Sequence, residues 1–175
     1  STSRRQRQMC IRDSADRMLS REETMYSEFL ETELSKITPV VNTSGSDSAM
    51  LDNTLEFLVM NGLPLPLAVM MTIPEPWINN QAMNQERKDF YQYYATMMEP
   101  WDGPASILFS DGDIMGAVLD RNGLRPSRYY ITDDDQLILS SEVGVLDFDT
   151  THIVKKERLH PGKMLLVDTV KGELI

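Results

Sequence analysis

The sequence predicts an α+β protein in which helices come first and a mostly antiparallel sheet follows. Up to about residue 98, apolar residues recur at helical spacing, and from about residue 105, short apolar segments are separated by turn residues. The two regions meet at EPWDGP, residues 99–104. A run of helices followed by a run of strands is typical of the α+β class.

Each expected helix rests on apolar spacing and on its end signals. Ser46, Asp47 and Ser48 are strong N-cap candidates, and Asn61–Gly62 supplies a stop signal for the helix that they open. Prolines bound a shorter apolar helix that follows. We expect four helices, over residues 15–36, from 46–48 to 61–62, over 65–72 and over 84–98.

The expected strands lie between turn residues. Asp-Gly-Asp at residues 111–113 is typical of a hairpin turn, an acidic turn occupies residues 133–135, and Pro161–Gly162 precedes the last strand. We expect five strands, over residues 105–110, 114–119, 128–132, 137–141 and 163–168.

Composition excludes several classes of protein. The formal net charge is −10, whereas a nucleic-acid binder needs clustered Lys and Arg to neutralise phosphates. No apolar run is long enough to cross a bilayer, so no membrane association is expected. Cys10 is the only cysteine, which excludes an internal disulfide and a cysteine-based metal cluster and fits a reducing, cytoplasmic location. His152 and His160 lack metal-ligand spacing, so no metal site is expected.

Residues 1–14, STSRRQRQMCIRDS, differ from the rest of the chain. They hold four arginines and one acidic residue, and without them 13 basic and 26 acidic residues remain. RRQRQMCIRDS resembles the conceptual translation of a common sequencing-library adapter. We therefore interpret residues 1–14 as non-native and assign residues 15–175 to the natural protein, although a nucleic-acid-binding arm or a targeting signal would also be basic. On this interpretation Cys10 is not a native residue.

Two segments carry charged residues and glycine beyond what a plain loop or hairpin requires. In Gly45–Ser48 a flexible loop presents Asp47 at a helix start. This is either a plain capping arrangement, worth roughly 1 kcal/mol, or a carboxylate that receives a ligand ammonium. The second segment is LDRNGLRP, residues 119–126, a charged, glycine-bearing connection between strands. Spacing alone assigns a function to neither segment.

Taken together, five stretches resemble the glutaminase domain of glutamate synthase large subunits, which belong to the class II glutamine amidotransferases. They follow the family's order and spacing, and the resemblance covers nearly everything after residue 15. The stretches are GSDSAMLDN (45–53), MMTIPEPW (70–77), MEPWDGPASILFSDG (98–112), LDRNGLRPSRYY (119–130) and SSEVGVLD (140–147).

The resemblance implies the N-terminal-nucleophile hydrolase fold, a four-layer αββα sandwich whose N-terminal part is missing here. It also implies the reaction: an amino-terminal cysteine attacks the side-chain amide of glutamine, and the released ammonia converts 2-oxoglutarate to glutamate elsewhere in the parent enzyme. FMN and an iron–sulfur cluster serve that second site, and no cofactor is expected in this segment. The implied partners are glutamine, the remainder of the synthase chain and a small electron-supplying subunit.

The resemblance also implies site residues. Asp47 matches the aspartate that holds the α-ammonium of glutamine, and Gly45 and Ser48 flank it and shape the pocket. A second element, DxNGxRP, is interpreted as structural support for the sheet. Its residues are Asp120, Gly123, Arg125 and Pro126. The family's nucleophilic cysteine and its oxyanion Asn-Gly, in a motif like HNGEIN, are not among these 175 residues. No catalytic residue is therefore assigned, and the segment alone is expected to be inactive.

Two other functions stay open at this point. One is a different class II amidotransferase, such as an amidophosphoribosyltransferase, although MEPWDGP and PSRYY favour glutamate synthase. The other is a non-catalytic module that keeps the fold and an amino-acid pocket. The module is expected if the natural gene begins near Ala15 without a segment led by a cysteine.

Overall fold

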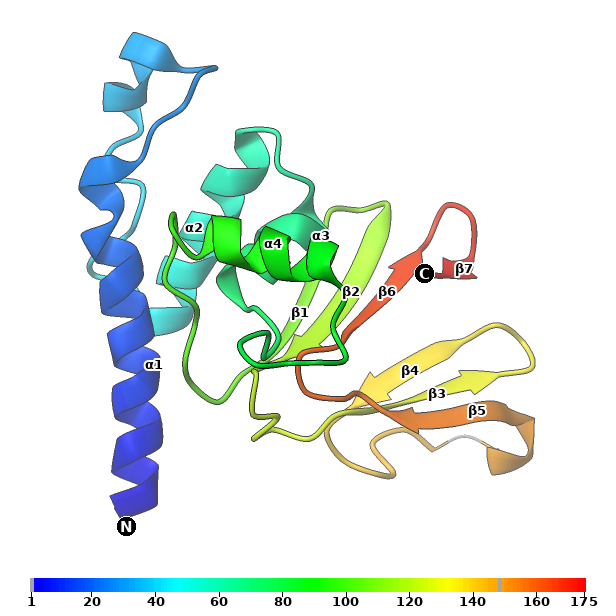
Figure 1. Ribbon diagram of the computed structural model, residues 1–175. Helices are drawn as coiled ribbons and strands as arrows, with labels where there is room; N and C mark the ends of the chain where they lie inside the picture. The colour runs from blue at the N-terminus through cyan, green and yellow to red at the C-terminus, as the bar shows by residue number, and fades with distance from the viewer. Residues whose placement is uncertain (1, 148) are drawn as a thin grey trace. The chain divides into compact units, whose positions relative to one another are not determined.

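The computed structural model describes residues 2–147 and 149–175, which form two compact units. The first unit, Ser1–Gly103, contains the long helices, and the second, Pro104–Ile175, contains the strands (Figure 1). The boundary falls within EPWDGP, where the sequence changes character. The predicted α+β class and its order of helices before strands are confirmed.

Helix α2 begins and ends where its sequence signals predict. The Ser46 hydroxyl accepts a backbone N–H of the first turn at 3.2 Å, and Asn61 and Gly62 close the other end, with Gly62 at φ = 88°. The short helix predicted over residues 65–72 is also confirmed, whereas the one predicted over 84–98 is shorter. The helical elements of this unit are α1 (Thr2–Ser20), the 3-10 turns η1 (Glu22–Thr24) and η2 (Glu31–Lys36), α2 (Asp47–Met60), α3 (Leu65–Thr72) and α4 (Gln85–Tyr94).

The predicted helix over residues 15–36 is wrong beyond Ser20, where α1 ends. Instead of a continuous helix, the turns η1 and η2 follow. The Glu22 carboxylate accepts the backbone N–H groups of Val40 and Val41 at 2.6 and 2.9 Å. These bonds join segments that are far apart in sequence, so local apolar spacing cannot reveal the break that accompanies them.

Methionine fills much of the core in the first unit. Met18 and Met50 are fully buried, and Met50 forms a cluster with Ala15 and Val41 where α1 packs against α2. An unbranched, flexible side chain suits irregular gaps between short helices. Methionine therefore serves as a core-filling residue at these two positions.

Two charged contacts stabilise the same unit. The Arg21 guanidinium donates two hydrogen bonds to the Glu99 carboxylate, at 2.8 and 2.5 Å, and this pairing lowers the pKa of Glu99. Glu75 is 5% exposed, pairs with Arg87 and accepts the Tyr91 hydroxyl at 3.2 Å. Burial, with the neighbouring Glu75 charge, raises the pKa of Tyr91 to about 12. A buried carboxylate with two such partners is satisfied.

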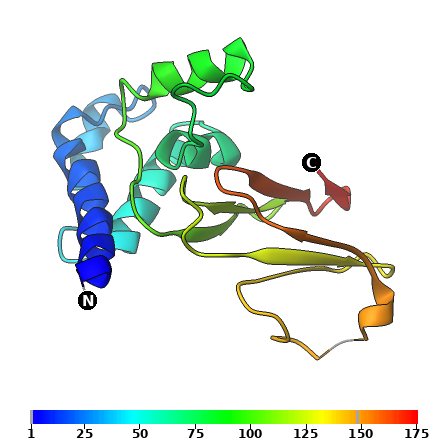
Figure 2. The same cartoon turned by 60° about the horizontal axis from the view of Figure 1, so that its bottom comes forward.

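The second unit contains two antiparallel sheets (Figure 2). Their strand orders are β1-β2-β6-β7 and β4-β3-β5. Strands β2 and β3 have the predicted bounds, and β1, β4 and β6 differ from prediction by one residue. The strands are β1 (Ser106–Ser110), β2 (Ile114–Leu119), β3 (Arg128–Thr132), β4 (Leu137–Ser140), β5 (Ile153–Arg158), β6 (Met164–Asp168) and β7 (Glu173–Leu174), and a 3-10 turn, η3 (Thr150–His152), precedes β5.

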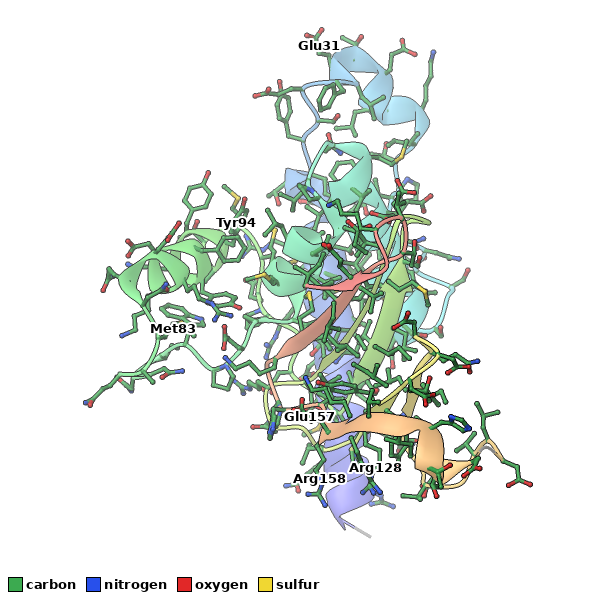
Figure 3. The ribbon with its side chains drawn as sticks, turned by 90° about the vertical axis from the view of Figure 1, so that its right-hand side faces the viewer. Glu31, Met83, Tyr94, Arg128, Glu157 and Arg158 are labelled. Carbon is green, nitrogen blue, oxygen red and sulfur yellow. The ribbon has the colours of Figure 1, made fainter. Side chains whose placement is uncertain are left out.

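Strand β5 lies outside the five predicted strands. It pairs with β3, which places Tyr129 opposite Glu157. Arg128 lies opposite Arg158 (Figure 3). Five of its six residues are exposed and four of them are charged, so it lacks the apolar alternation that predicts a strand. Charged, exposed edge strands of this kind resist pairing with other chains.

One apolar cluster joins the two sheets. Its buried members are Ala117 and Leu119 on β2, Tyr129 on β3, Leu159 after β5 and Leu165 on β6. Both sheets therefore share a core within this unit. Within residues 2–147 and 149–175, no helix is both long and apolar enough to cross a bilayer.

Candidate functional site

Asn42 shapes the loop that leads into α2. Its side-chain oxygen accepts the N–H and the hydroxyl of Ser44 at 3.0 and 2.8 Å, and its carbonyl accepts the N–H of Gly45 at 3.1 Å. A Cβ added at Gly45 would lie 3.1 Å from the Cβ of Ala49 and 3.3 Å from the Asn42 carbonyl oxygen. Glycine therefore allows this tight approach of the loop to the helix.

Asp47 is the first residue of α2, and its side chain is 29% exposed. A negative charge at this position is stabilised by the partial positive charge of the helix N-terminus. The Ser48 hydroxyl lies 3.0 Å from that of the cap residue Ser46. The structure thus places Gly45, Asp47 and Ser48 in one turn, and their role in ligand binding stays a prediction.

Asp47 has a charged partner that the sequence does not indicate. Nη1 of Arg12 donates to Oδ1 of Asp47 at 3.1 Å, while Nε of Arg12 lies 3.2 Å from Oδ1 of Asp16. Arg12 is 35 residues from Asp47 in the chain, and its side chain is 54% exposed. An exposed pair of this kind contributes little stability. The contact nevertheless shows that a cationic nitrogen can approach the Asp47 carboxylate.

Asp120 is a buried structural anchor in the second unit. It is 1% exposed, and its carboxylate accepts the backbone N–H groups of Ala105 and Asn122 at 3.1 and 3.0 Å. Its own N–H donates to the Ala105 carbonyl at 3.1 Å. Asp120 thereby ties the end of β2 to the residue that precedes β1, which supports the structural interpretation of this element.

The rest of the DxNGxRP element lies in the connection between β2 and β3. Gly123 has φ = 57°, and a Cβ there would lie 2.3 Å from Cγ of Pro161, so the position requires glycine on two grounds. Arg125 and Pro126 are exposed and line a hollow of about 410 Å³ beside Ser127. The four predicted residues therefore occupy one connection, in a different unit from Asp47.

The described residues offer no metal centre. Among residues 2–147 and 149–175, no group of three His, Cys, Asp or Glu side chains is arranged to hold a metal ion. His152 instead pairs with Asp133, its Nδ1 lying 2.9 and 3.0 Å from the two carboxylate oxygens. This hydrogen bond and the Asp133 charge raise the pKa of His152.

Comparison with known protein families matches residues 9–175 to the class-II glutamine amidotransferases. The chain belongs to this family. This amidotransferase chain is 50% identical over 165 residues to the glutamate synthase [NADPH] large chain of Bacillus subtilis. It is 49% identical over 166 residues to a glutamate synthase [NADH] of Saccharomyces cerevisiae and 47% over 161 residues to a ferredoxin-dependent glutamate synthase of Synechocystis. The resemblance to glutamate synthase is thereby confirmed.

These alignments cover 94%, 94% and 90% of the amidotransferase chain but only 11%, 8% and 10% of the three relatives. The chain therefore spans about a tenth of their length. The names of the relatives give NADPH, NADH and ferredoxin, yet the three identities differ by only three percentage points. The identities over this segment therefore do not separate these three electron donors.

Proposed function

We propose that this chain is part of the glutaminase domain of a glutamate synthase large subunit, and that Asp47 holds the α-ammonium of glutamine. The complete domain releases ammonia from glutamine, and the parent enzyme uses it to convert 2-oxoglutarate to glutamate. The support is the similarity to glutamate synthases over more than nine-tenths of the chain, together with the position of Asp47. A cytoplasmic location is part of this proposal.

The placement of Asp47 carries the binding argument. An ionised carboxylate only accepts hydrogen bonds, which suits an ammonium that only donates them. Its position directly after the Ser46 cap leaves its side chain 29% exposed, which supports access for an ammonium. Gly45 and Ser48 hold the turn in the shape that presents this carboxylate.

The catalytic step belongs to residues outside this chain. The 175 residues contain neither a cysteine-led segment nor an HNGEIN-like motif, so we expect the chain alone to be inactive. A cluster held by several cysteine thiolates does not fit a chain whose only cysteine is Cys10. FMN, the iron–sulfur cluster and a small electron-supplying subunit are therefore proposed for the parent enzyme and assigned no residue here.

The non-native origin of residues 1–14 remains part of the proposal. Their composition supports it, as does their likeness to an adapter translation. The family match starts at residue 9, however, and the Ser14 hydroxyl accepts the N–H of Asp102 at 2.8 Å. Genomic DNA upstream of the Ala15 codon decides the question. A reading frame that continues back through an HNGEIN-like motif supports the proposal, and one that encodes RRQRQMCIRDS in place refutes it.

The role of Asp47 is tested in the complete synthase by comparing glutamine with ammonium chloride as nitrogen source. Loss of a charge-assisted hydrogen bond costs about 1.5–3 kcal/mol, so Asp47→Asn should raise the KM for glutamine roughly 10- to 100-fold. Synthesis from ammonium should stay unchanged because it bypasses the glutaminase site. Asp52→Asn, at an exposed position of the same helix, is the matched control. Equal KM values in the two variants would refute the assignment.

A further inference from the structure

An apolar hollow of about 380 Å³ lies between the η2 region and α2. Phe29 and Met60 at this hollow are each 75% exposed, and Ile37 is 46% exposed. Clustered exposed apolar side chains mark interaction sites in folded proteins. The lining residues are Phe29, Leu30, Ile37, Val40, Asn53, Glu56, Phe57, Met60 and Asn61.

The hollow is a consequence of how the first unit folds. Asn53, Phe57 and Met60 are spaced by four and three residues, so they share one face of α2. Phe57 is 8% exposed and lines the hollow as a buried side chain. The opposite wall comes from residues 29–40, which the break after α1 places beside α2 as a 3-10 turn and its flanking loops. Among the described residues, those that line the hollow include none from an α-helix other than α2.

The surroundings of the hollow are acidic. Glu56 lines it, and the exposed residues Glu28 and Glu31 are the chain neighbours of lining residues Phe29 and Leu30. Lys36 is the only basic residue between positions 22 and 61, and it pairs with Glu33. A segment that docks here gains from carrying Lys or Arg beside its apolar side chain.

We propose that this hollow receives an apolar side chain, flanked by Lys or Arg, from a part of the glutamate synthase polypeptide outside these 175 residues. This inference rests on the proposed function. The chain spans 11% or less of its first two relatives, so most of the polypeptide is available as the occupant. A second copy fits worse, because two chains of net charge −10 repel each other.

The test uses the complete synthase with a photoreactive phenylalanine analogue in place of Met60. The matched control carries the analogue in place of Tyr93, which is 57% exposed on α4 and lies outside the hollow. After illumination, cross-linked peptides are identified by mass spectrometry. The expected product joins position 60 to the same polypeptide outside this segment, at a peptide with Lys or Arg beside an apolar residue. Yield at position 60 should exceed yield at position 93.

A cross-link from position 60 to residues 1–175 of a second copy would overturn the proposal in favour of self-association. A yield no higher than at position 93, or a cross-linked peptide without Lys or Arg, would also overturn it. A further variant, Glu56→Lys, reverses the charge at the hollow and should lower the yield, and an unchanged yield refutes the charge argument. Glutamine-dependent synthesis and the Asp47 comparison are measured on the same preparations. If they succeed while cross-linking fails, the docking proposal alone is wrong.

Discussion

Replacing Asp120 tests how much the second unit depends on one buried carboxylate. In Asp120→Ala, the buried N–H of Ala105 loses its side-chain acceptor, and the N–H of Asn122 also loses the carboxylate oxygen to which it donates. An unsatisfied buried donor costs about 1–3 kcal/mol, and a bond to a charged acceptor contributes about 1.5–3 kcal/mol. Because Asn122 is exposed, water can replace its partner in part. We expect a loss of about 2–4 kcal/mol in the free energy of unfolding.

The assay is urea unfolding followed by far-UV circular dichroism, which detects the loss of both helices and strands. Amide exchange at Ala105 gives a local readout, and it should accelerate in the variant. The control is Asp113→Ala, an exposed aspartate of the β1–β2 turn, expected to change stability by less than about 0.5 kcal/mol. Equal losses in both variants, with unchanged exchange at Ala105, would refute the anchoring role.

Two further predictions concern the same unit. Gly123→Ala should destabilise by about 1–3 kcal/mol, because it combines a positive φ with a Cβ 2.3 Å from Pro161. Gly144→Ala, with φ = 79° and open space around it, should cost less in the same denaturation assay, and the reverse order contradicts the steric argument. Asp133→Asn should lower the pKa of His152 in an NMR titration. The pKa of His152 is higher in the folded protein than in the unfolded protein. The stabilisation from the pairing with Asp133 is therefore fully present below the unfolded-state pKa and is lost as the pH rises through the folded-state pKa. An unchanged His152 pKa in the variant rules out the pairing.

The elements that the sequence predicts well are those with strong local signals. Helix α2 has a serine cap at its start and Asn61–Gly62 at its end, and both act within one turn of the helix. The apolar strands β2 and β3 pack into one buried cluster and have the predicted bounds. In each case the residues that decide the structure lie within or beside the element itself.

The elements that escape prediction depend on distant partners. The end of α1 is accompanied by hydrogen bonds in which the Glu22 carboxylate accepts the backbone N–H groups of Val40 and Val41, 18 and 19 residues away. Strand β5 becomes a strand because β3 offers it a free edge, whereas its own residues are mostly charged. The candidate site divides in the same way. The sequence predicts that Gly45, Asp47 and Ser48 share one turn, but it does not predict the pairing of Asp47 with Arg12.

The β1–β2 hairpin is closed at both of its ends by an aspartate. At the turn, Oδ1 of Asp111 accepts the N–H groups of Asp113 and Ile114 at 3.1 and 2.8 Å. At the open end, the Asp120 carboxylate accepts the N–H of Ala105. The spacing between the two closures fixes the number of residues in each strand. A one-residue insertion or deletion between them would break a closure or shift every side chain to the opposite face. We expect length changes to be tolerated instead in the exposed stretch of residues 141–147, where no strand is formed.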